Sequence, residues 1–406
     1  MTGGPLADIT VVDLTRALAG PHAAMMLADL GARVIKIENP GGGDDTRGWG
    51  PPFVGPPEVT GADAGPADAE EISTYFLSCN RNKQSVVLDL KSPDGRAGLT
   101  ELIRRGDVLL ENFRPGVLDR LGFTMDRITE LNPALVVLSI SGFGHDGPEG
   151  GRAGYDQIAQ GEGGLMSMTG PDPQTPTKVG VPISDLLAGM YGAYGVVAKL
   201  HERSRTGRGG LVRTSLLASV IGVHAYQGTR WTVAGEIPRA EGPHHPSICP
   251  YGLFHSADGV VQISVGSEGL WARFAPAFGI PLKGPEFSTN SDRVRNSAVV
   301  RGAIEEAFAG YSTPELLAKL SQVGVPSGEV KDLQQVYEWD QTRSQGLLID
   351  VEHPVLGPIQ LPGPPLRFFE PSGEEWHREH TAPPLLGQHT DEVLGWLAEP
   401  APPATG

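Results

Sequence analysis

A βαβ pattern in the first forty residues constrains the fold of this chain more than any other feature. Residues Ile9–Leu14 form an apolar run that predicts a buried strand, and Pro21–Leu30 predicts a helix with a proline near its start. Residues Arg33–Glu38 predict a second strand. Two strands joined through a helix run parallel, and the helix covers one face of the sheet. The sequence therefore predicts an α/β protein with a parallel sheet.

The rest of the chain extends this pattern and then departs from it. With 406 residues the chain is long for one hydrophobic core, so two domains are expected. Gly, Pro and His accumulate over Ala234–Pro250, which predicts a linker, and shorter strand and helix patterns after it predict a smaller α/β domain. The main elements expected between the first pattern and the linker are strands at Ser85–Leu90, Asp107–Glu111 and Leu135–Ser139, and helices at Asp94–Arg105, 186–203 and Leu216–Thr232.

Charge and cysteine content exclude several classes of protein. The formal net charge of −16 disfavours binding to nucleic acid, because nucleic-acid binders need a basic face. The two cysteines, Cys79 and Cys249, imply no disulfide framework, and neither has the spacing of a metal ligand. The N-terminal segment does not resemble a signal peptide, and no apolar stretch is long enough for a membrane helix. We therefore expect a cytoplasmic protein without a metal site.

The first turn after a strand carries no common nucleotide-binding motif. It reads TRALAGPH over Thr15–His22 and lacks the GxGxxG pattern of dinucleotide-binding dehydrogenases. P-loop, HExxH and GxSxG motifs are also missing from the sequence. A nicotinamide dehydrogenase is therefore disfavoured, although the missing motif does not exclude a nucleotide at the carboxyl ends of the strands.

Seven segments, taken together and in order, resemble the family III CoA-transferases of the CaiB/BaiF type. They span nearly the whole chain, and the resemblance rests on their common order rather than on any one of them. The segments are Leu6–Phe53, Tyr75–Gly95, Val108–Phe123, Gly154–Gly170, Val179–Ala193, Arg205–Leu217 and Ala382–Gly395.

The resemblance implies a domain arrangement and an assembly. It implies a large Rossmann-like domain built from residues 1–230 and 331–406, with a small α/β domain of residues 231–330 inserted between them. It also implies a homodimer of interlocked subunits. Acyl-CoA and small carboxylic acids would be the ligands, with coenzyme A as substrate and product and no tightly bound cofactor.

The resemblance assigns the nucleophile to Asp185, in the segment PISDLLAGMYG. A carboxylate there would attack an acyl-CoA and pass through a mixed anhydride to an aspartyl–CoA thioester. From the residues alone, an Asp ahead of an apolar helical run is usually a helix N-cap. We expect Asp185 to stand at the start of the 186–203 helix and to be kept ionised by the helix dipole.

Positions that match the family's CoA contacts are spread over the first half of the chain. Arg and Lys residues usually lie solvated on a protein surface, so each Arg or Lys at these positions has this alternative interpretation. Leu18 and Asn39 depart from the formyl-CoA transferase pattern, which disfavours formate and oxalate as substrates. The expected CoA-binding residues are Arg16, Ala17, Ala19, Leu88, Asp89, Lys91, Asn112, Phe113, Arg120, Tyr155 and Asp156.

Two other functions compete with CoA transfer. A 2-methylacyl-CoA racemase would use Asp185 as an acid/base opposite a His, but Tyr155 stands where that His is expected. A non-catalytic CoA-binding subunit would not need Asp185. The sequence leaves open the identity of the acids, the role of Glu268 and the role of His244–Gly252, which stands where the family places an active-site loop.

Overall fold

The computed structural model describes residues 3–55 and 71–400. These residues form two compact units. The first unit comprises Met1–Gly163, Val179–Gly228 and Asp340–Gly406, and the second comprises Gly164–Lys178 and Thr229–Trp339. The first unit is thus built from both ends of the chain.

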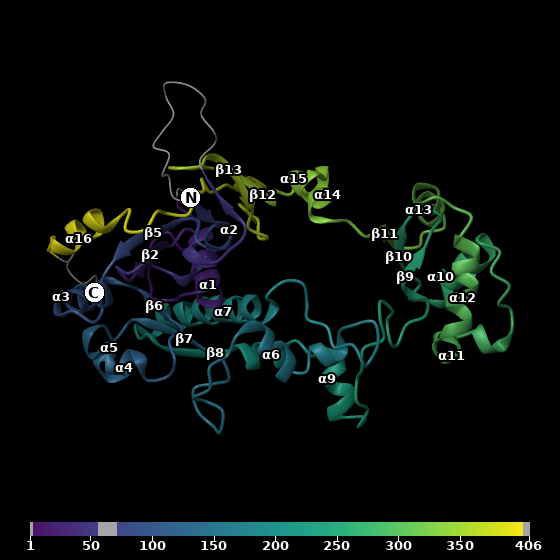
Figure 1. Ribbon diagram of the computed structural model, residues 1–406, viewed down its shortest axis with the longest axis horizontal. Helices are drawn as coiled ribbons and strands as arrows, with labels where there is room; N and C mark the ends of the chain where they lie inside the picture. Colours follow the sequence, from purple (N-terminus) through teal and green to yellow (C-terminus); the bar gives the residue numbers. More distant parts are fainter. Residues whose placement is uncertain (1–2, 56–70, 401–406) are drawn as a thin grey trace. The chain divides into compact units, whose positions relative to one another are not determined.

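The described part of the first unit contains a six-stranded sheet of order β5-β2-β1-β6-β7-β8 (Figure 1). Every neighbouring pair of strands is parallel, so the expected α/β protein with a parallel sheet is confirmed. Numbered along the chain, this is the 3-2-1-4-5-6 order of Rossmann sheets, whose switch point lies between β1 and β6. The strands are β1 Thr10–Asp13, β2 Arg33–Glu38, β5 Lys83–Val87, β6 Val108–Glu111, β7 Val136–Ser141 and β8 Gly210–Ser215.

The inner strands are apolar on both faces because helices cover both. Val11 packs in a core with helices α1 and α7, and its neighbour Val12 packs in a second core with α3, α5 and α16. Successive side chains of a strand point to opposite faces, so a continuous apolar run serves both cores. The covering helices are α1 Ala19–Asp29, α6 Asp156–Glu162, α7 Ile183–Thr206 and α8 Leu216–Gly222 on one face, and α3 Pro93–Arg105, α5 Met125–Leu131 and α16 Thr390–Ala398 on the other.

Local signals in the sequence set the ends of these helices. Ser92 precedes α3, and its side chain accepts a 2.9 Å hydrogen bond from Gly95 N, a cap that contributes about 1 kcal/mol. Helix α7 ends at Gly207, whose φ of 68° is left-handed and favours glycine. Helix α16, yellow in Figure 1, lies beside α3 and β5, although both of these elements are far from α16 in the sequence.

Two expectations about secondary structure are wrong. The predicted helix Leu216–Thr232 is two helices, α8 and α9 (Ala225–Thr232), because Ala225 has a left-handed φ of 48° that interrupts the helical backbone. Strand β8 was not expected. It lies at the edge of the sheet, where only alternate side chains are covered, so its sequence lacks a continuous apolar run.

The second unit, residues 164–178 and 229–339, contains a three-stranded antiparallel sheet of order β11-β10-β9. Its core is aromatic: Phe254, Phe274 and Phe308 are fully buried, and Phe278 joins them with a ring centroid 5.2 Å from that of Phe308. Its elements are β9 Tyr251–His255, β10 Val260–Ser264, β11 Ser327–Glu329, α10 Glu268–Ala277, α11 Asn290–Arg295, α12 Ser297–Phe308, α13 Thr313–Gln322 and α14 Leu333–Glu338.

Shorter elements complete the first unit. The C-terminal segment forms an antiparallel hairpin of β12 (Leu348–His353) and β13 (Gly357–Pro362). Across residues 3–55 and 71–400, no helix has the length and apolarity that crossing a membrane requires. The remaining elements of this unit are a 3-10 helix at Asp45–Gly48, β3 Phe53–Val54, β4 Ile72–Ser73, α2 Thr74–Leu77, α4 Val117–Arg120, α15 Asp340–Ser344, β14 Phe368–Phe369 and β15 Glu375–Trp376. The second unit also contains 3-10 helices at Met166–Met168 and Pro285–Phe287.

Candidate active site

The turn after β1 meets the end of β6 at the switch point of the sheet. The side chain of Asn112 binds the backbone of Arg16 through two hydrogen bonds. Arg16 N donates to Asn112 Oδ1 over 2.9 Å, and Asn112 Nδ2 donates to Arg16 O over 2.7 Å. The Arg16 guanidinium lies 5.8 Å from the ring centroid of Phe113. The structure thus brings together three expected CoA contacts where Rossmann-type sheets bind ligands.

A pocket of about 610 Å³ opens at these carboxyl ends of the strands. Its wall has apolar side chains such as Leu14, two exposed cations (Arg16 and Lys91) and one exposed carboxylate (Asp89), a combination suited to an adenine ring with its phosphates. The buried charged residues Lys36, Glu38 and Asp44 also border the pocket. Five of the expected CoA-binding residues border it: Arg16, Leu88, Asp89, Lys91 and Phe113.

Three other expected contacts lie outside this wall. Ala17 follows Arg16 with a left-handed φ of 65°, and Ala19 is buried at the start of α1. Arg120 is exposed at the end of α4, whose neighbours Val117 and Leu121 do border the pocket. Direct contact of these three residues with CoA remains a prediction.

Asp185 is the third residue of α7, and Pro182 stands at the N-cap position. Asp185 therefore lies in the first turn of the helix, as expected, although the helix begins at Ile183, three residues before the predicted start at 186. The helix begins earlier because Asp156 binds its first turn: Asp156 Oδ1 accepts a 2.8 Å hydrogen bond from Ser184 N. Residues Ile183 and Ser184 are thereby drawn into helical conformation ahead of Asp185.

Both carboxylate oxygens of Asp156 and its backbone carbonyl accept hydrogen bonds from other residues of the chain. Its Oδ2 accepts a 2.7 Å hydrogen bond from Gln160 Nε2, and its backbone carbonyl accepts one of 3.0 Å from Ser184 Oγ. The neighbouring Tyr155 is 67% exposed. Asp156 was expected to contact CoA, but its hydrogen bonds point to a role in holding the start of α7.

The pKa of Asp185 is raised to about 7. Burial is the larger cause, since it disfavours the charged form, and the negative charge of Asp156 adds to it. Asp185 is therefore only partly ionised at neutral pH in the unliganded protein, whereas the helix dipole was expected to keep it ionised. A helix N-terminus favours a carboxylate by only about 0.3–1 kcal/mol, which burial and a like charge outweigh here.

The sequence did not single out two aromatic residues near Asp185, Tyr75 and Trp49. Burial, followed by the charge of Asp185, raises the pKa of Tyr75 to about 12, so its hydroxyl stays protonated. Trp49 meets Tyr75 edge to face with ring centroids 5.1 Å apart. Both residues lie within the first two segments that carry the family resemblance, which was the signal available for finding them.

Close packing fixes the helix that carries Asp185 against the turn after β1. Gly189 lies one helical turn beyond Asp185, and a Cβ there would come within 2.6 Å of Ala19 O. His22 packs beside Gly189, and burial lowers its pKa to about 4, so its ring is neutral. Leu186, beside Asp185, packs with Leu18 in a small apolar cluster. Asp185 is thereby tied to the turn that carries Arg16.

In the second unit, Glu268 supports the segment His244–Gly252. Its carboxylate accepts hydrogen bonds from Asn290 N over 2.7 Å and Arg293 Nη1 over 2.8 Å. The fully buried Arg293 also donates to Cys249 O over 2.9 Å, and Asn290 Oδ1 accepts one from Cys249 N over 3.0 Å. Glu268 therefore helps to fix the backbone of this segment.

Cys79 and Cys249 are buried and unbridged, and burial raises the pKa of each thiol. Within the described ranges, no three or more His, Cys, Asp or Glu side chains gather in a way that would hold a metal ion.

A Rossmann-type sheet with a pocket at its switch point and a carboxylate of perturbed pKa defines an α/β enzyme that acts on a nucleotide-bearing substrate. The sequence pattern of CoA-transferase family III matches residues 6–390. The chain therefore belongs to CoA-transferase family III, as its sequence predicted. It is a transferase, and CoA thioesters are its substrates.

Individual relatives agree over nearly their full length. The chain is 37% identical over 403 residues to a succinate–glutarate CoA-transferase from Agrobacterium fabrum, covering 97% of this chain and 96% of the relative. It is 35% identical over 400 residues to an acetyl-CoA:oxalate CoA-transferase from Acetobacter aceti, covering 98% and 97%. A CaiB/BaiF family protein from Brucella suis superposes with a TM-score of 0.83 at 35% identity, covering 97% of this chain and all (100%) of that one.

Proposed function

We propose that Asp185 is the nucleophile of this CoA-transferase and that it carries CoA as an aspartyl thioester. The observation that supports this most is its raised pKa of about 7 in the first turn of α7. A buried carboxylate of raised basicity is a stronger nucleophile than a solvated one, and perturbed pKa values cluster at catalytic groups. The packing of Leu186 against Leu18 ties this carboxylate to the turn that borders the pocket.

The proposed reaction has four balanced steps. The Asp185 carboxylate attacks the acyl-CoA carbonyl and expels CoA thiolate, which leaves an acyl–aspartyl anhydride. The thiolate attacks the aspartyl carbonyl, forms the thioester and releases the donor acid. The acceptor carboxylate attacks this thioester to form a new anhydride, again expelling thiolate. The thiolate then attacks the acceptor carbonyl, which yields the new acyl-CoA and restores Asp185.

Small dicarboxylic acids are the proposed partners, with succinyl-CoA as the first donor to test. The relatives in Agrobacterium and Acetobacter are named for succinate, glutarate and oxalate, all of which are dicarboxylates. The Leu18 and Asn39 departures from the formyl-CoA transferase pattern lead us to place glutarate ahead of oxalate as acceptor. We place the enzyme in the cytoplasm, which its buried, unbridged cysteines support.

We also propose that the enzyme is a homodimer. An apolar groove of about 630 Å³ lies in the first unit between α1, α7 and the segment from Arg343 to His380. Tyr194 of α7 borders it with 73% of its surface exposed, and Met190 borders it with 48% exposed. Large apolar side chains gathered on one groove mark an interaction surface, and a second copy of this chain is the proposed occupant.

Trapping the thioester tests the mechanism. The enzyme is incubated with succinyl-CoA, reduced with borohydride, and the peptide carrying Asp185 is examined by mass spectrometry. Modification of Asp185 in the wild type but not in Asp185→Asn supports the proposal. An unmodified Asp185 together with α-proton exchange of a 2-methylacyl-CoA in deuterated water would instead favour the racemase, despite Tyr155 in place of the expected His.

A further inference from the structure

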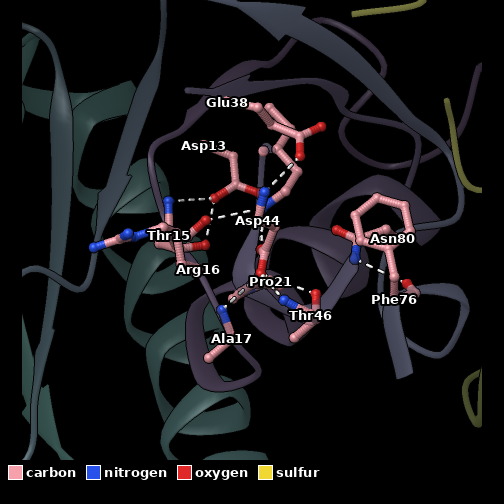
Figure 2. Close-up of polar contacts among 12 residues, drawn as sticks. Asp13, Thr15, Arg16, Ala17, Pro21, Glu38, Asp44, Thr46, Phe76 and Asn80 are labelled. Atoms are coloured by element: carbon pink, nitrogen blue, oxygen red, sulfur yellow. Dashed lines mark hydrogen bonds and ion pairs between the residues drawn. The ribbon is translucent and has the colours of Figure 1, made fainter. Parts of the chain in front are cut away.

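Side chains hold the turn from Thr15 to Ala17 that joins β1 to α1. Thr15 N donates to Asp13 Oδ1 over 2.9 Å, and Lys36 Nζ donates to Thr15 O over 2.8 Å. Ala17 N donates to Asp44 Oδ1 over 3.2 Å. Figure 2 shows Asp13 beside Thr15, and Asp44 reaching Ala17 from the loop after β2.

The middle and the end of the turn are held in the same way. Asn112 binds both the N–H and the carbonyl of Arg16, as described above. The thiol of Cys79 lies 3.9 Å from Ala17 O. Each backbone N–H and carbonyl of the three residues therefore has a side-chain partner, so the shape of the turn depends on those side chains.

The conformation of Ala17 explains why such support is needed. Its φ of 65° is left-handed, which costs a non-glycine residue about 1–2 kcal/mol. An isolated turn of this sequence would relax toward an ordinary backbone conformation. Surrounding structure must hold a strained residue of this kind, and such residues cluster at functional sites.

Lys36 and Asp44 form a fully buried ion pair within this support. Their charged groups are 2.8 Å apart, and both side chains are fully buried. Asp44 Oδ1 also accepts hydrogen bonds from Thr46 N and Thr46 Oγ1, over 3.0 and 2.9 Å (Figure 2). Burial opposes the charge on Lys36, but Asp13, Asp44 and other carboxylates raise its pKa above the usual value. The pair is therefore ionised, and its geometry is fixed.

We propose that Lys36 and Asp44 are positioning residues for CoA, because they hold the strained turn that presents Arg16 to the pocket. Both residues also border that pocket. The inference rests on the proposed function in taking CoA as the ligand there. Neither residue touches the reacting atoms. Their effect on affinity comes from a turn that is already in its binding conformation.

The test replaces the pair together. Lys36→Met alone would leave a buried unpaired carboxylate, whereas Lys36→Met/Asp44→Asn removes one charge of each sign and avoids that cost. The matched control is Asp107→Asn/Arg203→Met, at the amino ends of the central strands of the same sheet. There Asp107 pairs with Arg203 over 2.9 Å and accepts a 2.8 Å hydrogen bond from Thr10 N, so it also combines an ion pair with a backbone contact.

We expect both double variants to lose thermal stability but only Lys36→Met/Asp44→Asn to lose CoA affinity. Its Kd for CoA, measured by calorimetry, should rise about tenfold or more, because a displaced turn misplaces Arg16. Its KM for succinyl-CoA should rise more than its kcat falls. If this variant does not fold, Asp44→Asn alone, which keeps the shape and the acceptor for Ala17 N, should show a smaller rise in Kd.

The outcomes separate this inference from the proposed function. Unchanged CoA affinity in the folded variant, or an equal loss in both double variants, would overturn the positioning role, since the pair would then only stabilise the fold. A wild-type protein that fails to bind CoA would refute the proposed ligand of the pocket, and this inference would fall with it.

Discussion

The carboxylate of Asp156 accepts a 2.8 Å hydrogen bond from Ser184 N, the residue directly before Asp185. This contact begins α7 one turn earlier than its sequence suggests and places a negative charge beside the proposed nucleophile. The same residue thus orients Asp185 and helps to raise its pKa to about 7. Burial of the two carboxylates near each other makes Asp185 more basic than an ordinary Asp.

The first prediction concerns the pH dependence of the reaction. The nucleophile must be ionised, so kcat/KM for succinyl-CoA should rise with pH and level off above a midpoint near 7, the pKa of Asp185 in the free enzyme. Asp156→Asn removes the neighbouring charge and should lower this midpoint. The midpoint should stay above an ordinary Asp value because burial is the larger cause. A midpoint that Asp156→Asn leaves unmoved would contradict the assignment.

The second prediction concerns stability. Asp185 has a folded-state pKa near 7 against an ordinary 3.8, so the native protein holds a proton that the unfolded chain releases. Stability from this group is therefore lost as pH rises from about 4 to about 7. Asp185→Asn has no titrating group at this position, so it does not lose stability over this pH range. Its melting temperature should therefore lie several degrees above that of the wild type at pH 8, with a smaller difference at pH 5.

Thermal unfolding without ligand measures this effect. Asp8→Asn, a change of the same type at an exposed position, serves as the control and should shift the melting temperature equally little at both pH values. An Asp185→Asn difference that does not grow with pH would show that Asp185 is not perturbed in solution.

The third prediction concerns the pocket at the switch point. Lys91 borders it, whereas Arg120 lies outside the pocket wall. Lys91→Ala should raise the Kd for CoA about tenfold, as expected for the loss of one charge-assisted phosphate contact. The affinity of this variant should also depend less on salt concentration.

Dephospho-CoA identifies which phosphate Lys91 binds. Equal losses with CoA and dephospho-CoA place it on the pyrophosphate, and a loss confined to CoA places it on the 3′-phosphate. Lys283→Ala, at an exposed position of the second unit, is the control. Wild-type affinity in Lys91→Ala for both ligands would remove Lys91 from the site.

The fourth prediction concerns assembly. Tyr194→Glu places a charge on an exposed apolar residue that borders the groove, and it should convert the proposed dimer to a monomer in light scattering coupled to size exclusion. Tyr226→Glu, on another exposed tyrosine outside the groove, is the comparison. A wild-type monomer, or a Tyr194→Glu dimer as stable as the wild type, would contradict the proposal.

The sequence determined the class of fold and the family of this protein. An apolar run such as Ile9–Leu14 indicates burial directly, and glycine and proline mark where helices begin and end. These signals are local, so they could be read without knowing what packs against what. The order of the seven family segments added the family and singled out Asp185.

The tertiary structure decided the electrostatics and the supports of the site. No local pattern shows that Asp156 binds Ser184 N, that Trp49 meets Tyr75, or that Lys36 and Asp44 pair beneath the turn after β1. Each of these contacts joins residues whose partner is chosen by packing, not by spacing along the chain. The pKa of Asp185 follows mainly from its burial. A sequence gives only the average tendency of Asp residues to be exposed, whereas the folded structure determines the burial of this particular residue.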